Sequence, residues 1–259
     1  MVLAGIPLTA WRAPDGTPCL VAARTGAAWP CAAADGYLHT PLGEDAGPFA
    51  PPAPALSGPH TTAFVDGDVR ARLADIAENI LDTTHTSVVH QGYLRRAADR
   101  RPVEAHTASG PGWIAATYPP GAAPGGWGAR LIGAHRYTIR DRFTAPGIAE
   151  VLYTDQSRPV FCARFSLTPR SETETYIAGA ISVPGKGPAA LLKLAMLRVF
   201  FLRIFSEDRA ILELISANRG CHGNAPIVYT PQDLMRPGID AILSGRSPAV
   251  PSAPVRLRV

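Results

Sequence analysis

Short apolar runs separated by turn-forming residues characterise the first 41 residues. Extended runs at residues 7–12 and 19–23 flank Pro14-Asp15-Gly16, and residues 27–41 repeat the pattern around Asp35-Gly36. Because Pro, Asp and Gly at such positions favour tight turns, the pattern predicts two β-hairpins.

The first helical pattern follows a stretch rich in proline. This stretch, residues 44–59, predicts a connector without regular structure. From Val69 to His90, apolar residues recur at intervals of mostly three and four, the spacing of a helix with one buried face. These residues are Val69, Leu73, Ile76, Ile80 and Leu81. Residues 92–112 are polar and basic and predict a loop.

Between Trp113 and Val183 the pattern becomes that of β-strands joined by short turns. The predicted strands are residues 114–118, 136–143, 148–154, 160–167 and 173–183. Their order and the short turns predict an antiparallel meander. A long apolar helix from Ala189 to about Asn218 follows, and then a short helix from Leu234 to Leu243.

This order of elements predicts an α+β fold in which a curved antiparallel sheet holds the long C-terminal helix, with a cavity between them. Five aromatic residues near or in the predicted strands are candidates for the cavity walls, although aromatic residues in strands are more often simply core. They are Trp113, Tyr118, Tyr137, Phe143 and Phe165, and none is assigned to substrate.

Composition and charge narrow the classes of function. The chain has 259 residues, 46% of them hydrophobic, which is enough for a sizeable core. Its formal net charge of +4 comes mostly from arginine. No aromatic residues are interleaved with these arginines, so nucleic-acid binding is not predicted. The basic residues from Arg95 to Arg101 are either a solvated surface or a docking surface for an acidic redox partner or an anionic substrate.

Cysteine usage and the apolar segments indicate the compartment. The four cysteines are far apart and form no Cys-x-x-Cys pair, so neither a disulfide framework nor a tetrahedral zinc site is predicted. The N-terminus has no basic region typical of a signal peptide. Lys193, Arg198 and Arg203 mark a polar edge on the most apolar helix, which favours a core helix over a membrane span. We therefore expect a cytoplasmic protein.

The segment Glu78–His90 carries the most informative polar residues. Asp82 and His85 are three apart and share a helix face. His85 and His90 are five apart, so both reach one point only if the helix breaks or bulges. Two imidazoles and one carboxylate are the ligands of mononuclear Fe(II) sites that keep positions open for O2. The alternative is a polar helix face or satisfied core histidines.

A candidate carboxylate lies in the long C-terminal helix. Glu207-Asp208 has apolar residues on both sides, which would carry the acidic pair into or beside the core. Burial of a carboxylate is costly unless it is paired or bound to a metal. Alone, the pair is better explained by an exposed acidic turn of an amphipathic helix. Together with His85 and His90 it favours a metal site.

The combined pattern resembles a known family. Asn79-x-x-Asp82-x-x-His85-x4-His90, followed after a sheet by Glu207-Asp208-x-x-Ile211-Leu212-Glu213, is similar to the catalytic domain of Rieske non-haem iron oxygenase α subunits. The subgroup it most resembles is the O- and N-demethylase (vanillate demethylase-like) monooxygenases. The resemblance covers about residues 60–245.

The resemblance implies a helix-grip (START/Bet v 1-like) catalytic domain. His85, His90 and Asp208 would be the Fe(2+) ligands, and Glu207 would not. Asp82 would be catalytic, because the matching aspartate of the family bridges an iron-bound histidine to the Rieske cluster of an adjacent subunit. A carboxylate beside a metal-bound imidazole also fixes the ring and raises its basicity.

The N-terminal part departs from the family pattern. Family members hold a [2Fe–2S] cluster through Cys-x-His and Cys-x-x-His pairs. Cys19 and Cys31 have no histidines at those spacings, and Cys221-His222 are directly adjacent. We therefore expect residues 1–43 to be a truncated Rieske-like remnant without cluster ligands and residues 44–59 a connector. Residues 60–259 would be the helix-grip catalytic domain, with no [2Fe–2S] cluster in this chain.

The implied function is that of a non-haem Fe(II) oxygenase component of hydroxylase or demethylase type. It would act with O2 on a small hydrophobic or aromatic molecule and take electrons from an external Rieske or ferredoxin partner and its reductase, within a homo- or hetero-trimer-based oligomer. Two alternatives stay open. One is a non-catalytic structural or regulatory subunit of a Rieske oxygenase complex, and the other is a redox-neutral metal-dependent enzyme, such as a zinc enzyme that activates water.

Overall fold

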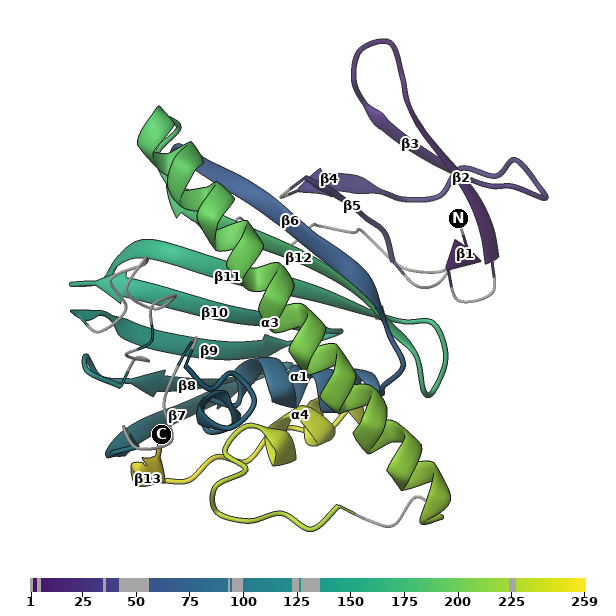
Figure 1. Ribbon diagram of the computed structural model, residues 1–259. Helices are drawn as coiled ribbons and strands as arrows, with labels where there is room; N and C mark the ends of the chain where they lie inside the picture. Colours follow the sequence, from purple (N-terminus) through teal and green to yellow (C-terminus); the bar gives the residue numbers. More distant parts are fainter. Residues whose placement is uncertain are drawn as a thin grey trace. The chain divides into compact units, whose positions relative to one another are not determined.

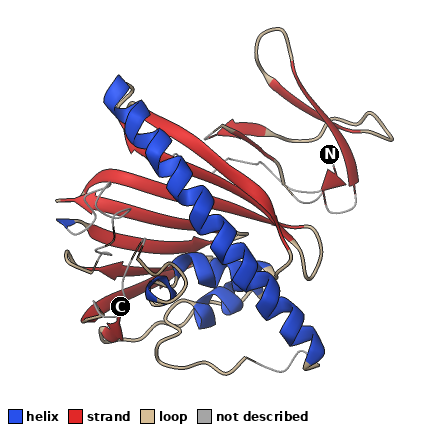
Figure 2. Cartoon of the chain, in the orientation of Figure 1, coloured by secondary structure: helices blue, strands red, loops and turns tan. Residues whose placement is uncertain are grey.

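The computed structural model describes residues 2–3, 6–34, 36–41, 56–92, 94, 100–122, 126, 136–223 and 227–259. The chain forms two compact units, Met1–Pro54 and Ala55–Val259. Figure 1 labels their elements, and Figure 2 shows that the helices belong to the second unit. The predicted turn residue Asp35, most of the predicted connector at residues 44–59 and most of the basic segment Arg95–Arg101 lie outside the described residues.

The first unit is built from short strands. They are β1 (Val2–Leu3), β2 (Ile6–Arg12), β3 (Pro18–Ala22), β4 (Ala32–Ala34) and β5 (Tyr37–His39). β1, β2 and β3 form one antiparallel sheet, while β4 and β5 pair with each other. Leu8, Leu20 and Trp29 are buried between them. The two predicted strand pairs are confirmed.

The second unit is an eight-stranded antiparallel sheet with helices on one face (Figures 1 and 2). The strands are β6 (His60–Val69), β7 (Pro102–Gly110), β8 (Trp113–Tyr118), β9 (Thr138–Thr144), β10 (Ile148–Asp155), β11 (Arg158–Pro169), β12 (Thr175–Pro184) and β13 (Val255–Arg258). Their order across the sheet is β13-β7-β8-β9-β10-β11-β12-β6. The helices are α1 (Leu73–Leu81), η1 (His85–Ser87), α3 (Pro188–Cys221) and α4 (Arg236–Leu243).

The long helix α3 runs obliquely across the sheet and the shorter helices lie beside it (Figure 1). The predicted α+β class, with a large antiparallel sheet around a long C-terminal helix, is confirmed. Apolar side chains of the sheet and of α1, α3 and α4 share one core. Among the described residues, no helix is both long enough and apolar enough to cross a membrane.

Three strands, β6, β7 and β13, were not predicted from the sequence. Val69 was expected to begin a helix but ends β6, which pairs with β12 along its whole length. The prediction of a loop across residues 92–112 is wrong, because Pro102–Gly110 forms β7. In β7 Val103 and Ala105 are buried, while Glu104 between them and His106 after them face solvent. That alternation suits a strand near a sheet edge, but small apolar residues make it hard to see in the sequence.

A buried ionic cluster holds α1 against α4. The guanidinium of Arg236, 2% exposed, donates to Asp75 at 2.8 Å and to Glu78 on α1, and to Asp240 at 2.8 Å on its own helix. Burial alone would raise the pKa of Asp75, but Arg72 and Arg236 outweigh that effect and lower it overall. Asp75 therefore stays ionised, and the cluster fixes the helix that leads into the His85–His90 segment.

Replacing Arg236 with Met should destabilise the protein by about 3–5 kcal/mol, because Asp75 and Glu78 both lose the buried cation that they share. Urea unfolding followed by circular dichroism at neutral pH measures the change. Arg256→Met is the matched control, since Arg256 is 74% exposed and lies 3.6 Å from Glu104. That variant should lose less than about 1 kcal/mol. Equal losses in the two variants would contradict a structural role for the buried cluster.

Candidate metal centre

Asp82 ends α1 and shapes the turn that follows. Its backbone is extended, with φ −88° and ψ 109°, so the helix stops at Leu81. Its carboxylate accepts hydrogen bonds from the N–H of Thr84 at 2.7 Å and of His85 at 3.1 Å. An aspartate that bonds the backbone two and three residues on favours a new turn over a continued helix. Here that new turn is η1, which begins at His85.

The break in the helix brings the two histidines together. Their Nε2 atoms lie 3.3 Å apart although the residues are five apart in sequence. A continuous helix would have turned them away from each other. His90 is 1% exposed and His85 is partly buried. The spacing of the histidines requires a break in the helix, and the structure has one. The helix ends before both histidines, however, and not between them.

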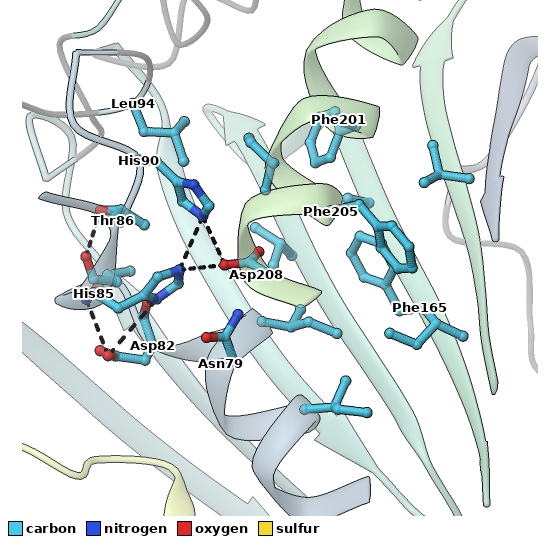
Figure 3. Close-up of a pocket in the computed structure, with 18 of the residues that line it drawn as sticks. Asn79, Asp82, His85, Thr86, His90, Leu94, Phe165, Phe201, Phe205 and Asp208 are labelled. Carbon is cyan, nitrogen blue, oxygen red and sulfur yellow. Dashed lines mark hydrogen bonds and ion pairs between the residues drawn. The ribbon is translucent and has the colours of Figure 1, made fainter. Parts of the chain in front are cut away.

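Asp208 reaches the same place from α3. It shares a helix face with Phe201, Phe205 and Leu212, which are spaced three and four residues apart and line one cavity. Asp208 Oδ1 lies 3.0 Å from His90 Nε2 and 3.6 Å from His85 Nε2. Figure 3 shows the three side chains pointing toward one another. The structure therefore brings together the three residues that the sequence analysis predicts as metal ligands.

The outer nitrogen of each ring is already committed as a donor. His85 Nδ1 lies 2.6 Å from the backbone carbonyl oxygen of Asp82, and His90 Nδ1 lies 2.9 Å from Glu207 Oε2. Because a carbonyl and a carboxylate only accept, each Nδ1 carries the hydrogen. In the neutral rings both Nε2 atoms then present lone pairs toward each other and toward Asp208.

Three electron-rich atoms facing one point repel each other unless a cation lies between them. Asp208 Oδ1 is buried and accepts no hydrogen bond from the residues that the structure describes. Burial would lower the pKa of His90, yet Asp208 and Glu207 outweigh it and raise that pKa above its ordinary 6.5. Burial would also raise the pKa of Asp208, but His85 and His90 hold it at about 2. Without a metal the site therefore attracts a proton.

The spacing of the three atoms also suits one metal ion. Ligand atoms about 2.0–2.2 Å from an ion, at angles of about 90–110°, lie about 2.8–3.6 Å from each other. The candidate ligand atoms of His85, His90 and Asp208 lie within 4.8 Å of one another, at pairwise distances of 3.0, 3.3 and 3.6 Å. Two histidines and one carboxylate on one side of an ion leave its other positions open.

The neighbouring acids have separate positions. Glu207, one residue before Asp208, lies outside the three-residue group and contacts the far nitrogen of His90. Its other oxygen accepts from Arg203 Nε at 2.7 Å. The carboxylate of Asp82 is 3.9 Å from His85 Nδ1, so the backbone carbonyl, and not that carboxylate, makes the short bond to the ring. The sequence did not predict this use of the backbone.

Two further polar residues border the site. Asn79 lines the cavity, and its side-chain nitrogen is buried without a hydrogen-bond partner among the described residues. The sequence pattern includes Asn79 but does not predict an amide group without a partner. Arg100, from the predicted basic patch, donates from Nε to the hydroxyl of Ser87 in η1 at 2.7 Å. That bond ties Arg100 to the turn that carries His85.

An apolar cavity of about 150 Å³ opens beside the three residues. Its walls come from α1, α3 and the strands β6 and β9–β12. Of the five aromatic residues proposed for the walls, Phe165 lines the cavity. Trp113, Tyr118, Tyr137 and Phe143 are not among its described lining residues. Trp113 lies instead under the guanidinium of Arg142, and Tyr118 and Phe143 are core. Phe161, Phe201 and Phe205, two of them on α3, line it as well.

A family model gives this arrangement its context. Residues 69–237 match the vanillate O-demethylase oxygenase C-terminal domain, a span of more than half the chain. The chain belongs to this family. It is therefore a Rieske oxygenase-type catalytic domain and an oxidoreductase of the oxygenase class. No curated protein matches it in sequence.

Solved structures share the fold at low identity. Dicamba monooxygenase bound to dicamba has TM-score 0.72 and 16% identity, covering 94% of this chain and 90% of that one. Another structure of that enzyme holds non-haem iron and dicamba. The terminal oxygenase of carbazole 1,9a-dioxygenase from Nocardioides aromaticivorans IC177 has TM-score 0.62 and 13% identity, with 95% and 89% covered. A quaternary ammonium Rieske monooxygenase, described with inter-subunit electron transfer, has TM-score 0.59 and 12% identity, with 86% and 75% covered.

Adjacent acids of α3 should differ in their effect on metal binding. Asp208→Asn should abolish tight binding, because it removes the negative ligand atom. Glu207→Gln should weaken affinity by about 10–100-fold, because it only loosens the orientation and basicity of His90. Titration of metal-free protein with Fe(II) under anaerobic conditions measures both. Equal loss in the two variants, or no loss in Asp208→Asn, would contradict the assignment of Asp208 as a ligand.

Proposed function

We propose that this protein is the oxygenase component of a multi-protein system, with a mononuclear Fe(II) held by His85, His90 and Asp208. It uses O2 to hydroxylate or demethylate a small, largely apolar molecule. The observation that carries the proposal is the convergence of three possible ligand atoms at the wall of an apolar cavity. Family membership and the iron of dicamba monooxygenase support iron over zinc.

The protein's own residues set up the chemistry. When bound, Fe(II) supplies positions for O2 and the change of oxidation state. His85 and His90 donate Nε2 because the Asp82 carbonyl and Glu207 hold their opposite nitrogens. Phe201, Phe205 and Ile80 keep the neighbouring space apolar, so that substrate replaces water beside the reacting centre. Each turnover inserts one oxygen atom into a C–H bond and reduces the other to water with two electrons and two protons.

The electrons need a donor outside this chain. Family members use a [2Fe–2S] cluster, and none of the four cysteines of this sequence has a histidine at the spacings that such a cluster requires. In our proposal residues 1–43 are a Rieske-like remnant without cluster ligands, and residues 60–259 are the catalytic domain. The alignment with dicamba monooxygenase covers 94% of the chain, which extends beyond the second unit and supports this origin. A separate Rieske or ferredoxin protein, with its reductase, would supply electrons within an oligomer.

Asp82 is the proposed entry point for those electrons. Its backbone carbonyl bonds the ring of His85, and its carboxylate side chain is 31% exposed. A donor that contacts Asp82 would therefore be one residue from an iron ligand. In this role Asp82 joins the donor's surface to His85, and it also maintains the turn through Thr84.

Elemental analysis of anaerobically purified protein tests the metal assignment. Wild type should contain close to one iron per chain and no acid-labile sulfide, and His85→Ala and Asp208→Ala should lose the iron. His106→Ala is the matched control, because His106 lies exposed on β7, and it should keep its iron. Tightly bound zinc with activity that needs no donor would favour the redox-neutral enzyme. Absence of any metal would favour a non-catalytic subunit.

Asp82→Asn should separate electron delivery from metal binding. Asparagine keeps one accepting oxygen for the N–H of Thr84 and removes the charge, while the backbone carbonyl that bonds the ring of His85 is unchanged, so iron content should stay close to that of wild type. The rate at which a reduced Rieske-type ferredoxin is oxidised should fall about tenfold or more. Stopped-flow absorbance measures this rate in wild type and variant. An unchanged rate would show that Asp82 serves only to shape the turn.

A further inference from the structure

The cavity wall contains an amide group whose nitrogen has no partner among the described residues. Asn79, on α1, lines the cavity from the same helix face as Ile76 and Ile80. Its side-chain nitrogen is buried and donates no hydrogen bond within the described part of the chain. Figure 3 shows this side chain extending from α1 toward Asp208. A buried N–H without an acceptor is unfavourable, and a ligand that supplies the acceptor offsets that cost.

A second polar atom beside α1 is in the same condition. The hydroxyl of Thr83, four residues after Asn79, also lines the cavity and is buried without a partner among the described residues. Other polar groups of this wall are already engaged. The hydroxyl of Thr86 donates to the carbonyl oxygen of Thr83 at 2.8 Å, and Arg209 Nε donates to Glu213 at 3.1 Å. Asn79 and Thr83 therefore offer two unused donors to a ligand in a mostly apolar cavity.

These donors restrict the ligand atom that binds to them. An amide N–H only donates, so its partner must have a lone pair. An ammonium group and a hydrocarbon have none. A carboxylate has lone pairs, but the ionised carboxylate of Asp208, whose pKa is about 2, lines the same cavity and repels it. The remaining class is a neutral oxygen, such as that of a ketone, an ether or an alcohol.

The amide of Asn79 turns toward such an oxygen without a change in the fold. The last side-chain torsion of asparagine has broad energy minima, so the amide rotates while α1 stays in place. This rotation breaks no hydrogen bond of the nitrogen with the described residues. A ligand oxygen is then held on the side of the cavity where His85 and Asp208 lie (Figure 3).

We propose that the substrate carries a neutral oxygen that accepts a hydrogen bond from the amide of Asn79, with the hydroxyl of Thr83 as a second donor. Its apolar body packs against the aromatic wall that includes Phe161 and Phe165. Asn79 is then a specificity-determining residue. This inference rests on the proposed function, since it names a chemical feature of the substrate of the same cavity.

Infrared spectroscopy of a bound probe tests this hydrogen bond directly. Acetophenone is a small apolar molecule with one carbonyl oxygen, and an isotopic label at the carbonyl carbon separates its C=O stretch from those of the protein. In wild-type protein this stretch should lie at a lower wavenumber than in hexane, because an accepted hydrogen bond weakens the C=O bond. The protein is kept metal-free with a chelator, so that no metal binds the oxygen instead. An unshifted stretch in wild type would overturn the proposal, whatever happens with any variant.

Variants then assign the hydrogen bond to one residue. Asn79→Leu, of similar volume, should return the stretch toward its position in hexane. Calorimetric titration with acetophenone and with α-methylstyrene, in which a CH2 group replaces the oxygen, gives a second measure. The ratio of ketone affinity to hydrocarbon affinity should fall about five- to tenfold in Asn79→Leu, the effect of one hydrogen bond. Asn218→Leu, at an exposed position near the end of α3, is the matched control and should keep the wild-type stretch and ratio. A stretch and ratio that stay unchanged in Asn79→Leu would contradict the proposal.

This test and the test of the metal assignment give separate results. Both measurements with the probes use metal-free protein, whereas the iron assignment depends on elemental analysis. Bound iron together with an unshifted stretch would overturn this inference alone. A shifted stretch that depends on Asn79, in a protein that binds no iron, would support this binding site and contradict the oxygenase function.

Discussion

The second unit depends on one constraint, which is that two imidazole lone pairs and a buried carboxylate oxygen point at the same place. His85 and His90 present Nε2 because the Asp82 carbonyl and Glu207 hold their outer nitrogens. Asp208 Oδ1 completes the group and, within the described part of the chain, accepts no hydrogen bond. Three electron-rich atoms at one point repel each other when no cation is present and attract a cation that lies between them. The hydrogen bonds that direct the histidine rings inward therefore create a set of metal ligands.

The fold supplies the two halves of that group from distant parts of the chain. His90 and Glu207 are 117 residues apart, and the sheet that separates them in sequence brings α3 back across α1. Arg236 fixes α1 through Asp75 and Glu78. The end of α1 at Asp82 then fixes where the histidines begin. The sheet, the ionic contacts of α1 and the end of α1 at Asp82 therefore together position the three candidate ligands.

The sequence predicted the strands between residues 113 and 183 and the long helix because their apolar side chains are large and regularly spaced. It missed β6, β7 and β13, which lie at or next to the sheet edges. In β7, small buried residues such as Ala105 alternate with exposed polar ones, so pairing with the neighbouring strand, more than its own pattern, identifies it.

The candidate metal centre could likewise be predicted only in part from the sequence. Residue types and spacing nominated His85, His90 and Asp208, and the resemblance preferred Asp208 to Glu207. Spacing could not indicate that the Asp82 carbonyl would hold His85, because this depends on the extended backbone at Asp82. Nor could it indicate that Asp141 lines the cavity while Arg140 and Arg142 face away, since that depends on the register of β9 in the sheet. Contacts that depend on backbone conformation or on strand register cannot be predicted from residue spacing and are seen only in the three-dimensional structure.

The central claim is that one metal ion lies where Nε2 of His85, Nε2 of His90 and Oδ1 of Asp208 converge. X-ray diffraction from crystals grown anaerobically with Fe(II), measured on both sides of the iron absorption edge, tests it most directly. We predict a single anomalous peak per chain, about 2.0–2.2 Å from each of the three atoms. No peak at this position, with the three side chains hydrogen-bonded to one another or to water instead, would contradict the account.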